Sequence, residues 1–221
     1  LVTGPTGSGK STTLYACIRD ILDPTINITT MEDPVELNID GVNQGQINNQ
    51  AGFTFAAGIR AILRQDPDVI MVGEMRDKET AGMAIESALT GHLVFSTLHT
   101  NDSPGAFPRL LEMGLEPFLV ATAIKGVLAQ RLVRRICSSC KEPLEIPQEL
   151  REELGLSPDM VFYHGKGCQR CDNSGYKGRC GIYEFLVPNE AVRNLILKRS
   201  SGDEIKKAAL ASEPAAAEIE Q

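Results

Sequence analysis

Residues 4–12 read Gly4-Pro5-Thr6-Gly7-Ser8-Gly9-Lys10-Ser11-Thr12, and the first eight match G-x-x-x-x-G-K-[ST] at every fixed position. The stretch stands between a short apolar run at 1–3 and residues 11–22, whose apolar side chains recur at helical spacing. Glycines let successive backbone N–H groups curl around phosphate, and a helix start adds partial positive charge. We expect residues 4–12 to bind nucleotide phosphates, with Lys10 reaching the β and γ phosphates and Ser11 ligating Mg²⁺. An ordinary glycine-rich turn is the weak alternative.

The segments that follow predict an α/β core with a mostly parallel sheet and helices on both sides. Apolar runs at 26–31, 68–73 and 92–98 predict strands, and residues 53–64 and 80–89 predict helices. Residues 110–135 are expected to add helical segments, one of which contains the basic residues Arg131, Arg134 and Arg135. We place the boundary of this core near residue 136.

Composition excludes several classes of protein. The chain has 221 residues, 42% of them hydrophobic, which rules out overall intrinsic disorder. A net charge of −7 argues against broad binding to nucleic acid. No apolar run is long enough to cross a bilayer, and residues 1–10 lack the features of a signal peptide. We therefore expect a soluble, cytoplasmic protein without a transmembrane segment.

Four of the six cysteines form two C-x-x-C pairs, Cys137 with Cys140 and Cys168 with Cys171, separated by 27 residues. Two such pairs supply four soft ligands, the set that a tetrahedral structural Zn²⁺ uses. Redox activity would need only one pair on a thioredoxin-like unit and is the weaker alternative. Because residues 137–180 are poor in apolar side chains, we expect zinc to hold this segment together.

We accordingly expect three parts. Residues 1–136 form the nucleotide-binding core, residues 137–180 form a zinc module, and residues 181–221 form a helical region that ends in an acidic, alanine-rich tail. Residues 191–210 are the predicted closing helices, and we expect the tail from residue 211 to fray.

Hydrolysis needs carboxylates near the phosphate loop, and the sequence offers two groups of candidates. Glu74 directly follows the buried strand 69–73, at the sheet edge where α/β proteins bind ligands. Glu32, Asp33 and Glu36 follow the strand before it, although a solvated turn is an equally good reading of Glu32 and Asp33. His92 and His99 bracket the strand 93–98. Composition alone favours a structural role for either histidine over a contact with phosphate.

Four blocks together, GPTGSGKST, MEDPVE, RQDPDVIMVGEMRD and TGHLVFSTLHTND, resemble the secretion ATPase superfamily, in particular the assembly ATPases of type II secretion and type IV pili. The resemblance runs from residue 1 to about residue 184. It implies that the blocks are the Walker A motif, Asp box, Walker B motif and His box of that family. It further implies that Glu36 is the catalytic base, that Glu74 belongs to the Mg²⁺ and water shell, and that His92 and His99 are catalytic.

The resemblance also implies a RecA-like core and an ATP-hydrolysing motor subunit in a homohexamer. Such a ring lies peripheral to the inner membrane, where it acts with a membrane platform and other cytoplasm-facing components to power secretion or pilus assembly. A tetracysteine module favours assembly over retraction. Family members also have an N-terminal domain that closes over the nucleotide; nothing here corresponds to it, so we expect a truncated chain with weak activity of its own.

Two other functions stay open at this stage. The chain could be a nucleotide-binding, zinc-stapled interaction domain that does not turn over ATP alone. It could also be a P-loop nucleotide kinase, although no arginine-rich lid stands out.

Overall fold

The computed structural model describes residues 1–211 and 216–218 of the chain. These residues divide into two compact units. Unit 1 contains Leu1–Arg131 and the described residues from Ile182 onward, and unit 2 contains Leu132–Gly181. Each unit is described by itself below.

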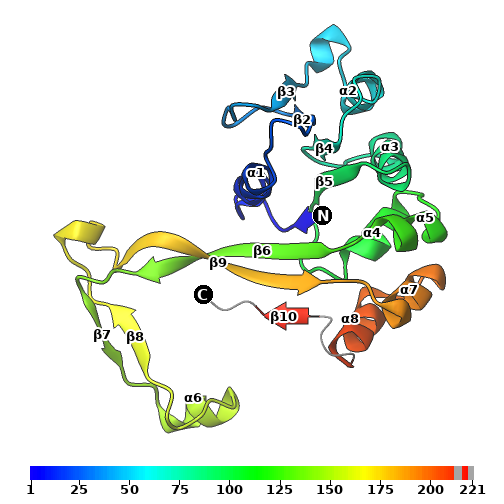
Figure 1. The fold of residues 1–221 in the computed structure, drawn as a ribbon. Coiled ribbons are helices and arrows are strands. Elements are labelled where there is room, and N and C mark those ends of the chain that lie inside the picture. Colours follow the sequence, from blue (N-terminus) through cyan, green and yellow to red (C-terminus); the bar gives the residue numbers. More distant parts are fainter. Residues whose placement is uncertain (212–215, 219–221) are drawn as a thin grey trace. The chain divides into compact units, whose positions relative to one another are not determined.

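An eight-stranded sheet with the order β10-β9-β6-β1-β5-β4-β2-β3 organises the chain (Figure 1). Its strands are β1 (Val2–Thr3), β2 (Ile28–Glu32), β3 (Asn43–Gln46), β4 (Val69–Val72), β5 (Leu93–Leu98), β6 (Val127–Ile136), β9 (Tyr176–Leu186) and β10 (Ala216–Glu218). The strands from β6 to β3 pair in parallel, and β10 pairs antiparallel with β9. The predicted α/β class with a mostly parallel sheet is confirmed.

Helices cover both faces of the sheet in unit 1. They are α1 (Lys10–Asp20), α2 (Phe55–Ile62), α3 (Lys78–Leu89), α4 (Ala106–Glu112), α5 (Pro117–Ala123), α7 (Glu190–Leu197) and α8 (Gly202–Ala211), with a 3₁₀ turn, η1 (Asn49–Ala51). Strand β4 shows the division, because Val69 and Met71 pack with α1 whereas Ile70 and Val72 pack with the apolar cluster of the other helices. A strand buried on both faces is what the unbroken apolar run 69–72 predicts.

Polar side chains at the helix starts explain where several helices begin. The Thr54 side chain accepts a hydrogen bond from the Ala57 N–H at the start of α2, and Asp77 accepts one from Thr80 at the start of α3. Asn189 caps α7 in the same way. The helices predicted at 53–64, 80–89 and 191–210 are therefore present, the last as the pair α7 and α8.

The prediction of helical segments throughout 110–135 is wrong for its last part. Helices α4 and α5 are present, but residues 127–136 form strand β6, which pairs with β1. Only the first part of β6 has buried side chains, and most of the residues from Arg131 to Arg135 are exposed. A strand that is exposed on both faces shows no alternation of apolar and polar residues, so the spacing of its arginines resembled a helix.

Unit 2 contains the hairpin of β7 (Lys141–Leu144) and β8 (Phe162–Gly165), helix α6 (Gln148–Glu153) between them, and a 3₁₀ turn, η2 (Gln169–Cys171). Within this described unit, the only buried hydrophobic side chains are those of Cys137 and Cys171. Unit 2 therefore lacks an apolar core that could stabilise it alone.

The predicted tail falls partly outside the described residues. Residues 216–218 form β10 against β9, and residues 212–215 and 219–221 are not described. The expectation that the tail frays therefore remains a prediction for residues 212–215 and 219–221.

Candidate functional site

The loop between β1 and α1 has the backbone of a phosphate cradle. Gly4 has φ +146°, and a Cβ atom there would lie 2.3 Å from the Gln130 carbonyl oxygen, so only glycine fits. Gly9, with φ +88°, is the left-handed residue before α1, whose first residue is Lys10. Within the described chain, the buried Ser8 hydroxyl has no hydrogen-bond partner. These features are suited to an anionic ligand, because the glycines allow the backbone N–H groups to face it and the Ser8 hydroxyl has a free hydrogen-bonding capacity next to the start of a helix.

Lys10 closes this loop with its side chain. Its Nζ donates hydrogen bonds to the carbonyl oxygens of Gly4, at 2.9 Å, and Pro5, at 3.1 Å. Partial burial lowers the pKa of the Lys10 ammonium, and the negative charge of Glu74 opposes that shift. The ammonium thus lies at the loop and within the field of the Glu74 carboxylate.

Glu74 and His99 meet at the carboxyl ends of β4 and β5. The Thr97 hydroxyl donates to the Gly73 carbonyl oxygen at 2.6 Å, and the Met75 N–H donates to the Thr97 carbonyl oxygen at 3.1 Å, which ties the two strand ends together. Glu74 Oε2 lies 3.6 Å from His99 Nε2, and the other carboxylate oxygen pairs with Arg76. The Glu74 side chain is only 15% exposed, whereas His99 is half exposed. The carboxylate is therefore anchored while the imidazole is accessible.

Glu32, the last residue of β2, is buried rather than solvated. Its carboxylate accepts hydrogen bonds from the hydroxyls of Tyr15 and Thr30 and from Gln44 Nε2. These three donors satisfy the buried carboxylate. Because they come from α1, β2 and β3, the hydrogen bonds join these three elements. Asp33, by contrast, is exposed, as a turn acid would be.

Glu36 is the exposed carboxylate beside the phosphate loop. Ser11 Oγ donates to Glu36 Oε1 at 3.4 Å, and the Glu36 N–H donates to the Tyr15 hydroxyl at 3.2 Å. Tyr15 therefore connects the buried Glu32 to the backbone that presents Glu36 to Ser11.

Two further residues, Thr3 and Gln130, hold the loop, and neither belongs to the motifs or candidate site residues named above. The Thr3 hydroxyl donates to the Leu98 carbonyl oxygen at 3.1 Å and accepts from the Thr100 N–H at 2.9 Å, which joins β1 to the end of β5. Gln130 of β6 accepts from the Thr13 hydroxyl at 2.7 Å. Their only sequence signal is a polar residue inside or next to an apolar strand.

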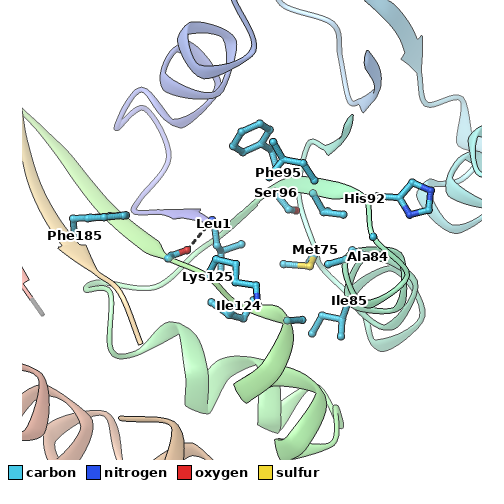
Figure 2. Close-up of a pocket in the computed structure, with 16 residues that line it drawn as sticks. Leu1, Met75, Ala84, Ile85, His92, Phe95, Ser96, Ile124, Lys125 and Phe185 are labelled. Atoms are coloured by element: carbon cyan, nitrogen blue, oxygen red, sulfur yellow. Dashed lines mark hydrogen bonds between the residues drawn. The ribbon is translucent and has the colours of Figure 1, made fainter. Parts of the chain in front are cut away.

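His92 lies at the other end of β5, at the opposite edge of the sheet from His99. Six strand residues separate the two, a length of about 20 Å. The His92 Nδ1 atom lies 2.9 Å from the Ser87 carbonyl oxygen. Figure 2 shows its imidazole beside, but turned away from, an apolar pocket of about 570 Å³ lined by residues such as Leu1, Met75 and Phe95. The structure therefore does not bring His92 to the phosphate loop of its own chain.

One edge of the sheet thus gathers Lys10, Ser11, Glu36, Glu74 and His99. Together they offer a cation for phosphate, a hydroxyl and a carboxylate suited to Mg²⁺, and a second carboxylate that can accept a proton from water. This arrangement can support hydrolysis of a nucleoside triphosphate.

The four cysteines form a separate cluster in unit 2, with all four Sγ atoms within 4.8 Å of one another. Cys137 and Cys168 are 3.9 Å apart at sulfur, Cys140 and Cys171 are 3.8 Å apart, and Cys168 and Cys171 are 3.7 Å apart. Four thiolates at about 2.3 Å from a tetrahedral zinc would be separated by about 3.8 Å. The donor set and its dimensions therefore fit zinc.

Almost the whole chain is similar in sequence to known proteins. A sequence model of the family described as "Type II/IV secretion system protein" matches residues 1–219. The type II secretion system protein E of Dickeya dadantii is 55% identical over 196 residues, which cover 89% of this chain and 39% of that protein. The type IV pilus assembly ATPase PilB of Thermus thermophilus is 54% identical over 213 residues, 95% of this chain and 24% of that one.

The fold also resembles a solved structure. The pilus retraction motor PilT, solved with bound ADP, superposes with a TM-score of 0.68 at 33% sequence identity, over 95% of this chain and 52% of that one. The chain thus spans less than half the length of each of the two curated relatives above.

Proposed function

The chain belongs to the type II/IV secretion system protein family, and from this premise we propose that it is the ATP-hydrolysing core of a motor subunit for type II secretion or type IV pilus assembly. One observation supports this function above others: Ser11 and Glu36 are in contact at the sheet edge where Glu74 meets His99. Binding alone would need the loop, but not accessible acid and imidazole groups around it.

Each group has a proposed part in the reaction. The backbone of residues 4–12 and the Lys10 ammonium hold the triphosphate, and Glu36 orients and deprotonates the attacking water. Ser11 and Glu74 would hold Mg²⁺, which neutralises charge on the β and γ phosphates when it is bound. We assign to the imidazole of His99, which lies beside Glu74, the stabilisation of charge on the transferred phosphoryl group. His92 is left out of this set because it precedes β5, at the end of that strand opposite to His99.

We propose zinc as the resident metal of the cysteine cluster, with residues 137–180 as the zinc-binding module, residues 1–136 as the ATPase core and residues 181–221 as the closing region. The sulfur distances and the absence of other buried hydrophobic side chains in the described unit 2 support a structural role for the metal.

We further propose that six copies form a ring peripheral to the inner membrane, next to the platform of the secretion or pilus machine. The relatives' names support the machine, and the similar identities of the secretion and pilus proteins, 55% and 54%, leave both branches within the proposal. None of the helices in the described part of the chain could span a bilayer.

The decisive experiment replaces Lys10 with alanine in the full-length protein and measures ATP hydrolysis and nucleotide affinity. We expect turnover to be abolished, because the cation at the phosphates is lost. Lys206→Ala, which changes the same residue type on the exposed side of α8, is the matched control and should leave turnover unchanged. Wild-type turnover in Lys10→Ala would overturn the proposed function.

A further inference from the structure

Unit 2 exposes apolar side chains at the end of its β7–β8 hairpin, in residues 144–161, here called the tip. Leu154, Met160 and Val161 are 60%, 50% and 65% exposed, and Leu144 and Leu150 are also exposed. Leu150 lies in α6, and Leu154, four residues later, is the residue that ends this helix. Within the described unit these side chains have no core to join, and exposed apolar patches of this kind are typical of surfaces that bind another molecule.

The tip is also acidic. It contains five acids, Glu145, Glu149, Glu152, Glu153 and Asp159, against one base, Arg151. The Arg151 guanidinium is engaged within the tip, where it donates to the carbonyl oxygens of Ser157 and Met160. In this described segment none of the five acids forms an ion pair. An apolar patch with an acidic rim fits a partner surface that is basic and partly apolar.

The same unit also provides a surface of this kind. It consists of residues 132–136, which precede Cys137, and residues 176–181, which follow Cys171. These residues are here called the ribbon. The ribbon contains four bases, Arg134, Arg135, Lys177 and Arg179, and no acid. All four are exposed, and among the described residues none of them forms an ion pair. The Arg134 guanidinium lies 4.0 Å from the centre of the Tyr176 ring, and Val133 beside it is 40% exposed. Arginine and tyrosine are enriched among the residues that contribute most to protein–protein binding, and the exposed valine adds apolar area beside them.

We propose that the tip of one copy docks on the ribbon of a second copy of this chain. The contact is heterologous, because each copy uses two different surfaces, and such contacts generate closed rings when the rotation between copies closes. This proposal rests on the proposed function in one respect, that motor subunits act as a ring. It assigns to unit 2 the role of holding neighbouring copies together. The acids of the tip and the bases of the ribbon orient the two surfaces and make the contact dependent on salt concentration. The leucines of the tip and Val133 of the ribbon contribute the apolar area that the contact buries.

A photocrosslinking residue at Leu154 of the full-length protein tests the contact directly. Equal amounts of isotopically light and heavy protein are mixed, and the crosslinked peptides are identified by mass spectrometry. We expect mixed light–heavy crosslinks from Leu154 to peptides that contain ribbon residues. Crosslinks only within one copy, or only to segments outside the ribbon, would overturn the proposal, as would the absence of crosslinks in the oligomeric protein.

Charge reversal provides the second arm. We expect Glu149→Lys with Glu153→Lys in the tip, or Arg135→Glu with Arg179→Glu in the ribbon, to lower the crosslink yield about tenfold. A mixture of tip-reversed and ribbon-reversed proteins should restore the yield, because every tip then meets a ribbon of opposite charge. Glu86→Lys with Glu190→Lys, at exposed positions of unit 1, makes the same change in net charge as the tip reversal; it is the control for that pair and should leave the yield unchanged.

The outcomes separate this contact from the ATPase proposal. A mixture that fails to restore crosslinking, or reversals that leave it unchanged while zinc content is normal, would overturn the contact. Because none of the four reversed positions belongs to the nucleotide site, ATP hydrolysis by Lys10 and Glu36 variants would remain an independent measurement.

Discussion

The hydroxyl of Tyr15 donates a hydrogen bond to the carboxylate of Glu32, and both side chains are at least 95% buried. The same hydroxyl accepts the N–H of Glu36. Because Glu36 is the proposed catalytic base, this buried pair sets the position of a reacting group without itself meeting the nucleotide.

Replacing Tyr15 with phenylalanine should therefore lower kcat several-fold while nucleotide affinity stays close to that of the wild type. Loss of the donor to a buried carboxylate should also lower the free energy of unfolding by about 1–3 kcal/mol. Steady-state kinetics, nucleotide titration and urea denaturation measure the three quantities. A variant that loses stability but keeps the wild-type kcat would show that Tyr15 is structural only.

The contribution of Tyr15 to stability should depend on pH in the alkaline range. Burial, followed by the hydrogen bond to Glu32, raises the pKa of Tyr15 to about 12. In the unfolded chain the phenol titrates near about 10, so the stabilisation is complete below that pH and is lost as the pH rises toward the folded pKa. The measurement is the difference in unfolding free energy between wild type and Tyr15→Phe, from about pH 8 to about pH 11. A difference that stays constant over this interval would contradict the assignment.

Glu36→Gln should reduce kcat by about 10²-fold or more and leave ATP affinity within about twofold of the wild type. The carboxylate acts on water in the transition state and contributes little to binding of the ground-state phosphates. Asp40→Asn, at an exposed acid four residues further along, is the control. Parallel losses of affinity and turnover would assign Glu36 to substrate binding instead.

Removal of metal should unfold unit 2 and spare unit 1. Purified protein should contain about one zinc per chain, and a strong chelator should abolish protection of the amide hydrogens in β7, β8 and η2. Protection in β4 and β5 should persist, because that part of the chain has its own apolar core. Metal-free protein with unchanged exchange in unit 2 would count against a structural zinc.

The features that the sequence predicts best depend on neighbouring residues in the chain. The phosphate loop is a local pattern, and Glu74 lies at the carboxyl edge because it directly follows a short apolar run. The burial of Glu32 has no such signal, since its donors Tyr15 and Gln44 come from elements 17 residues before it and 12 residues after it. Only the packing of α1 and β3 against β2 distinguishes Glu32 from the exposed Asp33.

The separation of the two histidines, in contrast, can be predicted from the sequence. A strand between His92 and His99 places them at opposite edges of a parallel sheet, so only one of them can lie near the loop of the same chain. Strand β6 is the contrary case. Its exposed second part belongs to a ribbon without a core, and no periodicity distinguishes such a segment from a helix before the pairing with β1 is known.

The central position of β1 determines when the phosphate loop can assemble during synthesis. Val2 pairs with Thr97 of β5 and Leu128 of β6, whereas β2, β4 and β5 pair over much shorter separations, as between Val69 and Leu93. Contacts between distant residues form late because their loop entropy must be overcome first. The phosphate loop that follows β1 is thus completed after β2, β4 and β5 have paired, although β1 precedes those strands in the sequence. The nucleotide proposed to bind at this loop would then stabilise only those chains in which β1 has already been inserted between its two neighbours.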